Sequence, residues 1–182
     1  MKKGFTLIEL LIVIGILAIL ATTVVLVLNP AQLLAQARDT QRISDLSTLK
    51  SAVAIYLATA TSPTLGEQDR STSNATCGVG TGTCTVNAST TVAGNGWVGV
   101  DLTGTSGGST VATLPLDPTN DATYQYAYAG DDTNKTFELN TRLESTKYRG
   151  QMANDGGDDS TCSTYTETTC YYEVGTDPAL DL

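Results

Sequence analysis

A single carboxylate, Glu9, stands at the start of a long apolar run, and it is the side chain here with the most specific chemistry. Residues 10–28 carry no charge, and their only polar side chains are the hydroxyls of Thr22 and Thr23. A carboxylate in hydrocarbon costs about 2.5–3.5 kcal/mol, and ionisable residues kept inside membrane segments are usually functional. Glu9 is therefore a candidate functional residue.

The apolar run is nineteen residues long, which gives roughly 28 Å of helix and matches the hydrocarbon thickness of a bilayer. A secretory signal has a shorter apolar core and a small-x-small cleavage site, whereas Ala18 and Ala21 are one residue too far apart. A plain single-pass anchor explains the length and the positive Lys2/Lys3 flank. It does not explain Glu9 or the Gly-Phe junction before the run.

The N-terminal motif reads Gly4-Phe5-Thr6-Leu7-Ile8-Glu9-Leu10. It resembles the N-terminus of type IV pilins and type II secretion pseudopilins. In that family a membrane peptidase cuts after the glycine and methylates the new N-terminal residue. The resemblance implies cleavage between Gly4 and Phe5, N-methylation of Phe5, and an assembly role for Glu9.

Physical chemistry gives each residue of the motif a part in this process. Gly4 lets a protease approach the backbone closely because it has no side chain, and Lys2 and Lys3 hold the leader on the cytoplasmic side. Cleavage leaves a positive amine on Phe5. In a stack of identical helices, Glu9 of one subunit could pair with the Phe5 amine of its neighbour, and pairing makes buried charges tolerable.

The resemblance implies a structural subunit of a type IV pilus-like filament, not an enzyme. It also implies a prepilin peptidase, an assembly ATPase and a platform protein as partners. The chain would first lie in the inner or cytoplasmic membrane as a single-pass protein with its C-terminal domain outside, then in an extracellular or periplasmic filament. One alternative is a subunit of a type II secretion or DNA-uptake pseudopilus. Another is a membrane-anchored binding or enzymatic ectodomain.

The composition excludes several classes of active site. The 182 residues include no histidine, which excludes Ser-His-Asp and Cys-His catalysis and histidine-ligated metals. The formal net charge of −9 argues against nonspecific nucleic-acid binding and favours a soluble acidic surface. No cofactor is required by this reading.

Four cysteines form two local pairs, Cys77/Cys84 and Cys162/Cys170. An even number of cysteines in an exported domain favours disulfides, and four-cysteine zinc sites usually have closer spacing. We predict the two local pairings, while a cross-link between the pairs remains an alternative.

The chain divides into a leader (residues 1–4), a transmembrane and filament-core helix (5–29) and an exported globular domain (30–182). One long helix is predicted from Phe5 to about residue 60, and Pro30 should kink or break it. An apolar face recurs at helical spacing in its second half, which also carries the charges of Arg38, Asp39, Arg42 and Asp45. These charges are interpreted either as a solvated face or as contacts between subunits.

A loop region is predicted for residues 61–113, with one short strand at 96–102, and an antiparallel sheet with a C-terminal loop for 114–182. Alternating runs on either side of residues 130–132 predict a hairpin, and residues 171–174 a third strand. Leu114-Pro115-Leu116-Asp117-Pro118 followed by a Tyr-x-Tyr strand resembles the C-terminal region of major pseudopilins and some pilins, although Thr119-Asn120-Asp121 departs from the pseudopilin pattern. The predicted fold is α+β and pilin-like, with the sheet packed on the helix.

An acidic loop, Asp155-Gly156-Gly157-Asp158-Asp159, has two interpretations. It is either solvated, or it binds calcium, which prefers six to eight oxygen ligands. In the second case Asp117 or Asp121 could contribute to the site. The resemblance adds that major pseudopilins bind calcium in their C-terminal loops.

Overall fold

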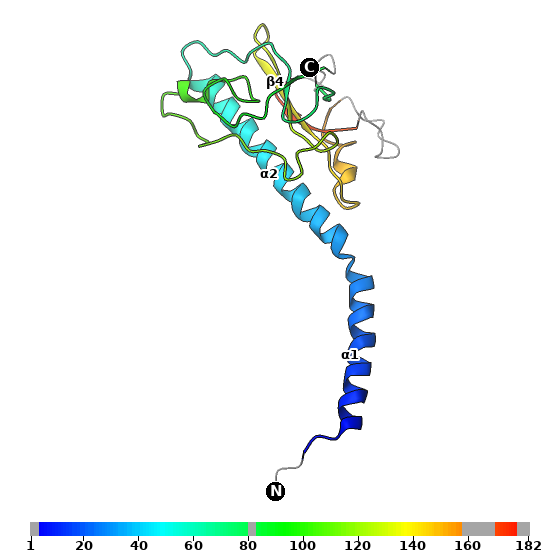
Figure 1. The fold of residues 1–182 in the computed structure, drawn as a ribbon. Helices are drawn as coiled ribbons and strands as arrows, with labels where there is room; N and C mark the ends of the chain where they lie inside the picture. The colour runs from blue at the N-terminus through cyan, green and yellow to red at the C-terminus, as the bar shows by residue number, and fades with distance from the viewer. Residues whose placement is uncertain (1–3, 80–82, 158–169, 178–182) are drawn as a thin grey trace. The chain divides into compact units, whose positions relative to one another are not determined.

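The computed structural model describes residues 4–79, 83–157 and 170–177. The chain forms two compact units, Met1–Ala35 and Gln36–Leu182, and each is described by itself. The first unit holds the apolar helix and the second holds the sheet (Figure 1).

Helix α1 spans Leu7–Leu28 and consists almost entirely of apolar residues. Its two hydroxyl side chains are satisfied within the helix, since Thr22 donates to the carbonyl of Ala18 and Thr23 to that of Leu20, both at 2.8 Å. Within the described residues, one helical stretch, Leu7–Val25, is long and apolar enough to cross a membrane, with a mean hydropathy of 2.7.

Helix α1 ends where the sequence predicts a break. Asn29 adopts a left-handed conformation with a φ of 42°, and helix α2 begins at Pro30 and runs to Thr59. Proline has no N–H to continue the hydrogen-bond ladder and keeps the preceding residue out of the α region. The long helix predicted from Phe5 is therefore broken at Pro30, which is one of the two outcomes predicted there, and the first helix begins at Leu7 because Thr6 caps it.

The second unit contains a five-stranded sheet in the order β2-β1-β3-β4-β5. Its strands are β1 (Arg70–Ser71), β2 (Thr85–Val86), β3 (Ala127–Asp131), β4 (Thr136–Thr141) and β5 (Tyr172–Gly175). The central pairs are antiparallel, with Tyr128 opposite Leu139 and Leu139 opposite Val174. Because β1 and β2 are parallel, the sheet is mixed, whereas the sequence predicted an antiparallel one.

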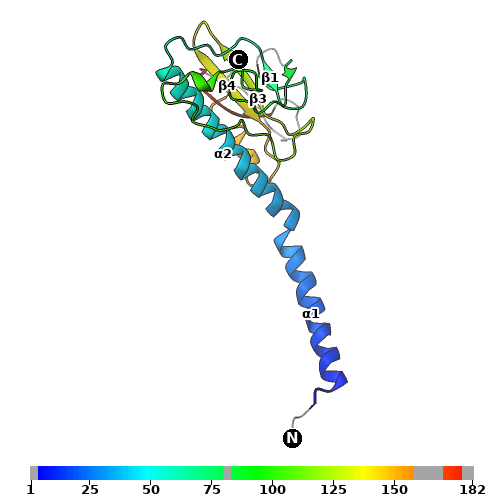
Figure 2. The ribbon, with the colours of Figure 1, turned by 60° about the vertical axis from the view of Figure 1, so that its left-hand side comes forward.

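Two layers cover the sheet, one on each face. On one face, Leu46, Leu49 and Val53 of α2 form the main core with Tyr128 and other large side chains of the sheet. The described part of α2 after Ala35 lies beside the sheet in both views (Figures 1 and 2). On the other face, alanines of β3 pack against the segment around a disulfide.

The predicted strand at residues 96–102 is wrong. This segment contains bends, one isolated bridge between Ala93 and Asp101, and the start of a short 3₁₀ helix, η1 (Leu102–Gly104). Its apolar residues nevertheless belong to the core. Among them is Trp97, whose indole N–H donates to the carbonyl of Pro115 at 2.9 Å. A second 3₁₀ helix, η2, spans Arg149–Gln151.

A buried guanidinium group, that of Arg42, connects α2 to two segments that are far away in the sequence. Its Nε and Nη2 atoms donate to the two carboxylate oxygens of Asp117 at 2.6 and 3.0 Å. Its Nη1 atom donates to Asp39 at 2.9 Å and to Glu144 at 3.0 Å. The ring of Tyr124 lies 4.7 Å from the guanidinium carbon. We call Arg38, Asp39, Arg42, Asp117 and Glu144 the Arg42 cluster.

The carboxylates of the cluster also bind backbone. Asp39 accepts the N–H groups of Glu144 and Ser145 at 3.0 and 2.7 Å, and Asp117 accepts that of Thr119 at 2.8 Å. Arg42 and Asp39 are fully buried. For Asp39 and Arg42 the interpretation as a solvated face is therefore wrong, because these two side chains fasten the helix to loops of its own chain.

The surroundings of Arg42 favour its charged form. Burial alone would lower the pKa of Arg42, but hydrogen bonds and attraction from Asp117, with hydrogen bonds from Glu144 and Asp39, raise it above its ordinary value. Asp45 does not join the cluster. It accepts the hydroxyl of Tyr126 at 2.8 Å, and burial raises the pKa of its carboxyl group.

The first prediction concerns the buried cation. Arg42→Met should destabilise the second unit by about 3–5 kcal/mol, because buried carboxylates would lose their counter-charge. Unfolding in urea, followed by the fluorescence of Trp97 in the full chain in detergent, measures this. Arg38→Met is the matched control, since that side chain is 37% exposed and also pairs with Glu144. Equal losses for the two variants would contradict a special role for Arg42.

The second prediction concerns pH. Burial alone would raise the pKa of Glu144, but hydrogen bonds from Arg38 and Arg42 hold it below its ordinary value of 4.5. The Glu144 carboxylate therefore contributes its full stabilisation when the pH is above its ordinary pKa of 4.5. This stabilisation is lost as the pH falls through the lower pKa that Glu144 has in the folded state.

The free energy of unfolding should thus fall less steeply on acidification in Glu144→Gln than in the wild type. Urea titrations between about pH 5 and about pH 3 measure the two slopes. Glu67→Gln, at an exposed position, is the matched control and should keep the wild-type slope. A wild-type slope in Glu144→Gln would show that the pairing does not contribute.

Candidate functional site

The N-terminal motif forms a capping box at the start of α1. The side-chain oxygen of Thr6, the N-cap residue, accepts the backbone N–H of Glu9 at 3.3 Å. In return, the Oε2 atom of Glu9 accepts the backbone N–H of Thr6 at 2.8 Å and its hydroxyl at 2.7 Å. This reciprocal arrangement satisfies N–H groups that a helix start leaves without partners. The carboxylate of Glu9 thus points back toward the N-terminus.

Gly4 and Phe5 precede the helix in an open setting. A β-carbon built onto Gly4 would meet no atom of this chain within 4 Å, and Phe5 is 73% exposed. Nothing within the described chain therefore requires glycine at position 4. Any requirement for it must come from another molecule that approaches this junction.

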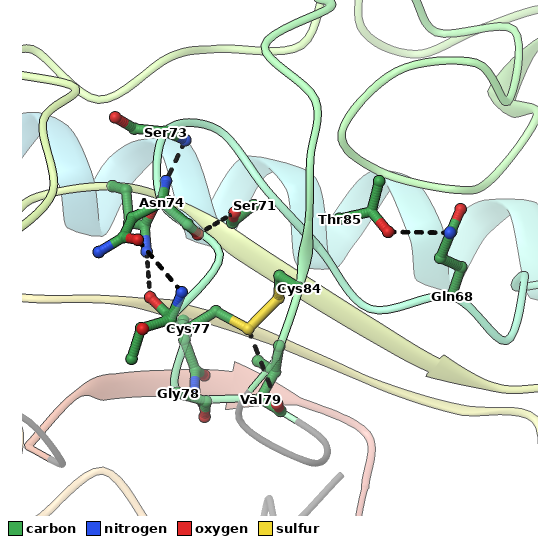
Figure 3. Close-up of a disulfide and its surroundings, with 12 residues drawn as sticks. Gln68, Ser71, Ser73, Asn74, Cys77, Gly78, Val79, Cys84 and Thr85 are labelled. Atoms are coloured by element: carbon green, nitrogen blue, oxygen red, sulfur yellow. Dashed lines mark hydrogen bonds between the residues drawn. A yellow bond between two sulfur atoms is a disulfide. The ribbon is translucent and has the colours of Figure 1, made fainter.

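The structure forms the Cys77–Cys84 disulfide, which is one of the two local pairings predicted from the sequence. Figure 3 shows that Gly78 and Val79 lie in the loop that it closes. Both sulfur-bearing residues are buried with Val79 against two alanines of β3. The disulfide therefore fixes Cys77, Val79 and Cys84 on the sheet face opposite α2.

The second predicted pair falls partly outside the described residues. Cys162 lies outside them, whereas Cys170 is buried next to Leu143 and Met152. The segment around the disulfide lies close to the segment around Cys170. A β-carbon at Gly78 would overlap the ring of Tyr171, the neighbour of Cys170, so only glycine fits at this contact.

The predicted calcium ligands in the described part of the chain each accept hydrogen bonds from other groups of the protein. Asp117 binds Arg42, and Asp121 accepts the backbone N–H groups of Thr123 and Tyr124, both at 2.8 Å. Asp155 accepts the N–H groups of Gly157 and Glu173 at 3.1 and 2.9 Å, and burial raises its pKa. Asp158 and Asp159 lie outside the described residues.

Among the described residues, no group of three or more acidic or cysteine side chains could hold a metal ion. Calcium binding by the acidic loop therefore stays a prediction.

Sequence reasoning missed two residues that matter in these sites. Thr6 was not singled out, although Thr-x-x-Glu before an apolar run is the local pattern of a capping box. The sequence presents Arg42 only as one of several charges in the second half of the predicted helix. Nothing local marks it as buried, because its main partner lies 75 residues away.

Comparison with known proteins gives one match, and it covers the N-terminal motif. Residues 1–25 match the family model described as the prokaryotic N-terminal methylation motif. No curated protein and no solved structure matches the chain. The match includes the capping box and helix α1 as far as Val25, which fit membrane insertion of a pilin-type protein. At its N-terminus, this chain therefore carries the signature of type IV pilins and pseudopilins.

Proposed function

We propose that this protein is a structural subunit of a type IV pilus-like filament. It is made as a precursor in the cytoplasmic membrane, cleaved after Gly4 and N-methylated on Phe5. A prepilin peptidase carries out the processing, and an assembly ATPase and a platform protein drive polymerisation. The second unit forms the exported domain, and α1 forms the filament core.

The single observation that carries the proposal is the methylation motif at residues 1–25, joined to an apolar helix with one carboxylate. The open setting of Gly4 supports cleavage at this junction, since a protease needs access to the backbone on both sides of the bond. The carboxylate of Glu9 supports assembly, because an uncompensated charge in hydrocarbon favours any partner that brings an opposite charge.

Assembly follows from the chemistry of cleavage. Hydrolysis of the bond between Gly4 and Phe5 converts an amide nitrogen, which carries no charge, into an amine, which is protonated at neutral pH. A precursor thus offers a carboxylate without a matching amine, and a processed subunit offers both. Two processed subunits that are staggered along their helices can pair the amine of one with Glu9 of the other, in surroundings of low dielectric where the attraction is strong.

A short secretion or DNA-uptake pseudopilus is the second candidate. Its support is the stretch Leu114-Pro115-Leu116-Asp117-Pro118, which resembles a segment of major pseudopilins and some pilins. Filaments sheared from cells and measured by electron microscopy separate the two candidates, because long filaments favour a pilus.

The third prediction concerns processing. Gly4→Val should leave an uncleaved precursor in the membrane, because a branched side chain would obstruct the peptidase next to the bond it cuts. Mass spectrometry of the N-terminus distinguishes the intact start from an N-methylated Phe5. Gly15→Val is the matched control, since the space around Gly15 is also open and the position is remote from the junction. A processed Gly4→Val chain would remove this role.

The fourth prediction concerns assembly. Glu9→Leu should insert and be cleaved normally but yield far fewer filaments, because the Phe5 amine would have no partner in the filament core. Immunoblots of sheared filaments and of the membrane fraction measure the two pools. Val13→Leu, one helical turn away on α1, is the control and should assemble. Abundant filaments from Glu9→Leu would count decisively against the pairing.

A further inference from the structure

We propose that Thr6 is a positioning residue for assembly, which holds one oxygen of the Glu9 carboxylate and leaves the other for the Phe5 amine of a neighbouring subunit. This inference rests on the proposed function. Thr6 thus has a role in assembly besides capping its own helix. One oxygen of Glu9 binds Thr6, and the other is left to bind the amine.

The two oxygens of Glu9 have different surroundings. Oε2 accepts two hydrogen bonds, one from the backbone N–H of Thr6 at 2.8 Å and one from its hydroxyl at 2.7 Å. In the described part of the chain, Oε1 makes no hydrogen bond. A carboxylate has about four lone-pair sites, so Glu9 keeps the capacity to accept further donors while it serves the capping box.

The capping box lies entirely on the mature side of the cleavage junction, because it consists of residues 6–9. Processing after Gly4 therefore removes none of its donors or acceptors. The Oε2 atom of Glu9 accepts the backbone N–H of Thr6, the residue next to Phe5. The capping box therefore directs the carboxylate toward the end of the chain where cleavage creates the new amine. Carboxylate and amine thus lie at the same end of the helix.

Holding the side chain in advance favours association. Glu9 is exposed in the isolated chain, and an exposed glutamate that had to be ordered on assembly would lose rotamer freedom at that moment. Ordering one such side chain at an interface costs enough to weaken binding by about three- to tenfold. The hydrogen bond from the Thr6 hydroxyl orders the Glu9 side chain already in the free subunit, so less rotamer freedom is lost when the subunits associate.

A plain helix cap predicts a different dependence on residue 9. Glutamine can complete a capping box as well as glutamate can, so the contribution of Thr6 to helix structure would be the same with either residue. Positioning for an amine needs the negative charge of Glu9. The effect of changing Thr6 should therefore depend on whether residue 9 is charged.

The test is a double-mutant cycle on the full, processed chain in detergent micelles. Self-association is measured by sedimentation and by chemical cross-linking of the wild type, Thr6→Val, Thr6→Ser, Glu9→Gln and the double variant Thr6→Val/Glu9→Gln. Valine keeps the shape and the backbone N–H of residue 6 but removes the hydroxyl, whereas serine keeps the hydroxyl. Circular dichroism records whether each variant retains its helix.

Thr6→Val should weaken self-association by about three- to tenfold, and Thr6→Ser should retain the wild-type value. In the Glu9→Gln background, Thr6→Val should cause no further loss. An equal loss in both backgrounds would reduce Thr6 to a helix cap, and wild-type association of Thr6→Val would remove its role altogether.

The same experiment tells failure of this inference from failure of the proposed function. If Glu9→Gln weakens self-association while Thr6→Val matches the wild type, the pairing of Glu9 stands and the role of Thr6 falls. If Glu9→Gln associates as the wild type does, the pairing itself is refuted, and the role of Thr6 falls with it.

Discussion

A guanidinium group that is removed from water must be surrounded by acceptors, and in the second unit this constraint is met by three separate segments of the chain. Arg42 lies on α2, Asp117 in the loop before β3, and Glu144 after β4. Asp117 and Glu144 fix their loops to the helix through hydrogen bonds with the planar guanidinium group of Arg42. Such bonds require a defined direction as well as a short distance, so they position these loops more specifically than apolar contacts alone would. The position of the sheet on α2 thus depends on polar geometry as well as on the core.

The same rule operates in the first unit with a local solution. Glu9 has no cation within its own helix, and the capping box supplies N–H and O–H donors in place of a counter-charge. Donors of this kind satisfy part of the carboxylate but do not neutralise it. The Arg42 cluster therefore contains its compensating charges within one chain. Under the proposed function, the charge of Glu9 is compensated by the amine of a neighbouring subunit.

Much of the fold could be predicted because its patterns are local. Helical spacing and Pro30 gave the two helices, and alternating residues gave β3, β4 and β5. Strands β1 and β2 could not be predicted, because two residues carry no periodicity and their pairing depends on distant partners. The burial of Arg42 could not be predicted from the sequence for a related reason. A charge pair three residues apart looks the same in sequence on a surface and in an interior, and only the return of Asp117 and Glu144 distinguishes the two.

The exposed apolar surface of α1 explains why a carboxylate there has consequences. Leu7 is 81% exposed and Val27 is 82% exposed, so the helix depends on surroundings that this chain does not supply. Lipid and a second copy of the helix are equally apolar, and apolar contact by itself hardly discriminates between them. A copy that has been processed also brings an amine, which lipid tails lack. Under the proposed function, Glu9 therefore gives the helix a preference for other processed subunits over lipid. Before cleavage, the helix is compatible with a bilayer but has no such preference.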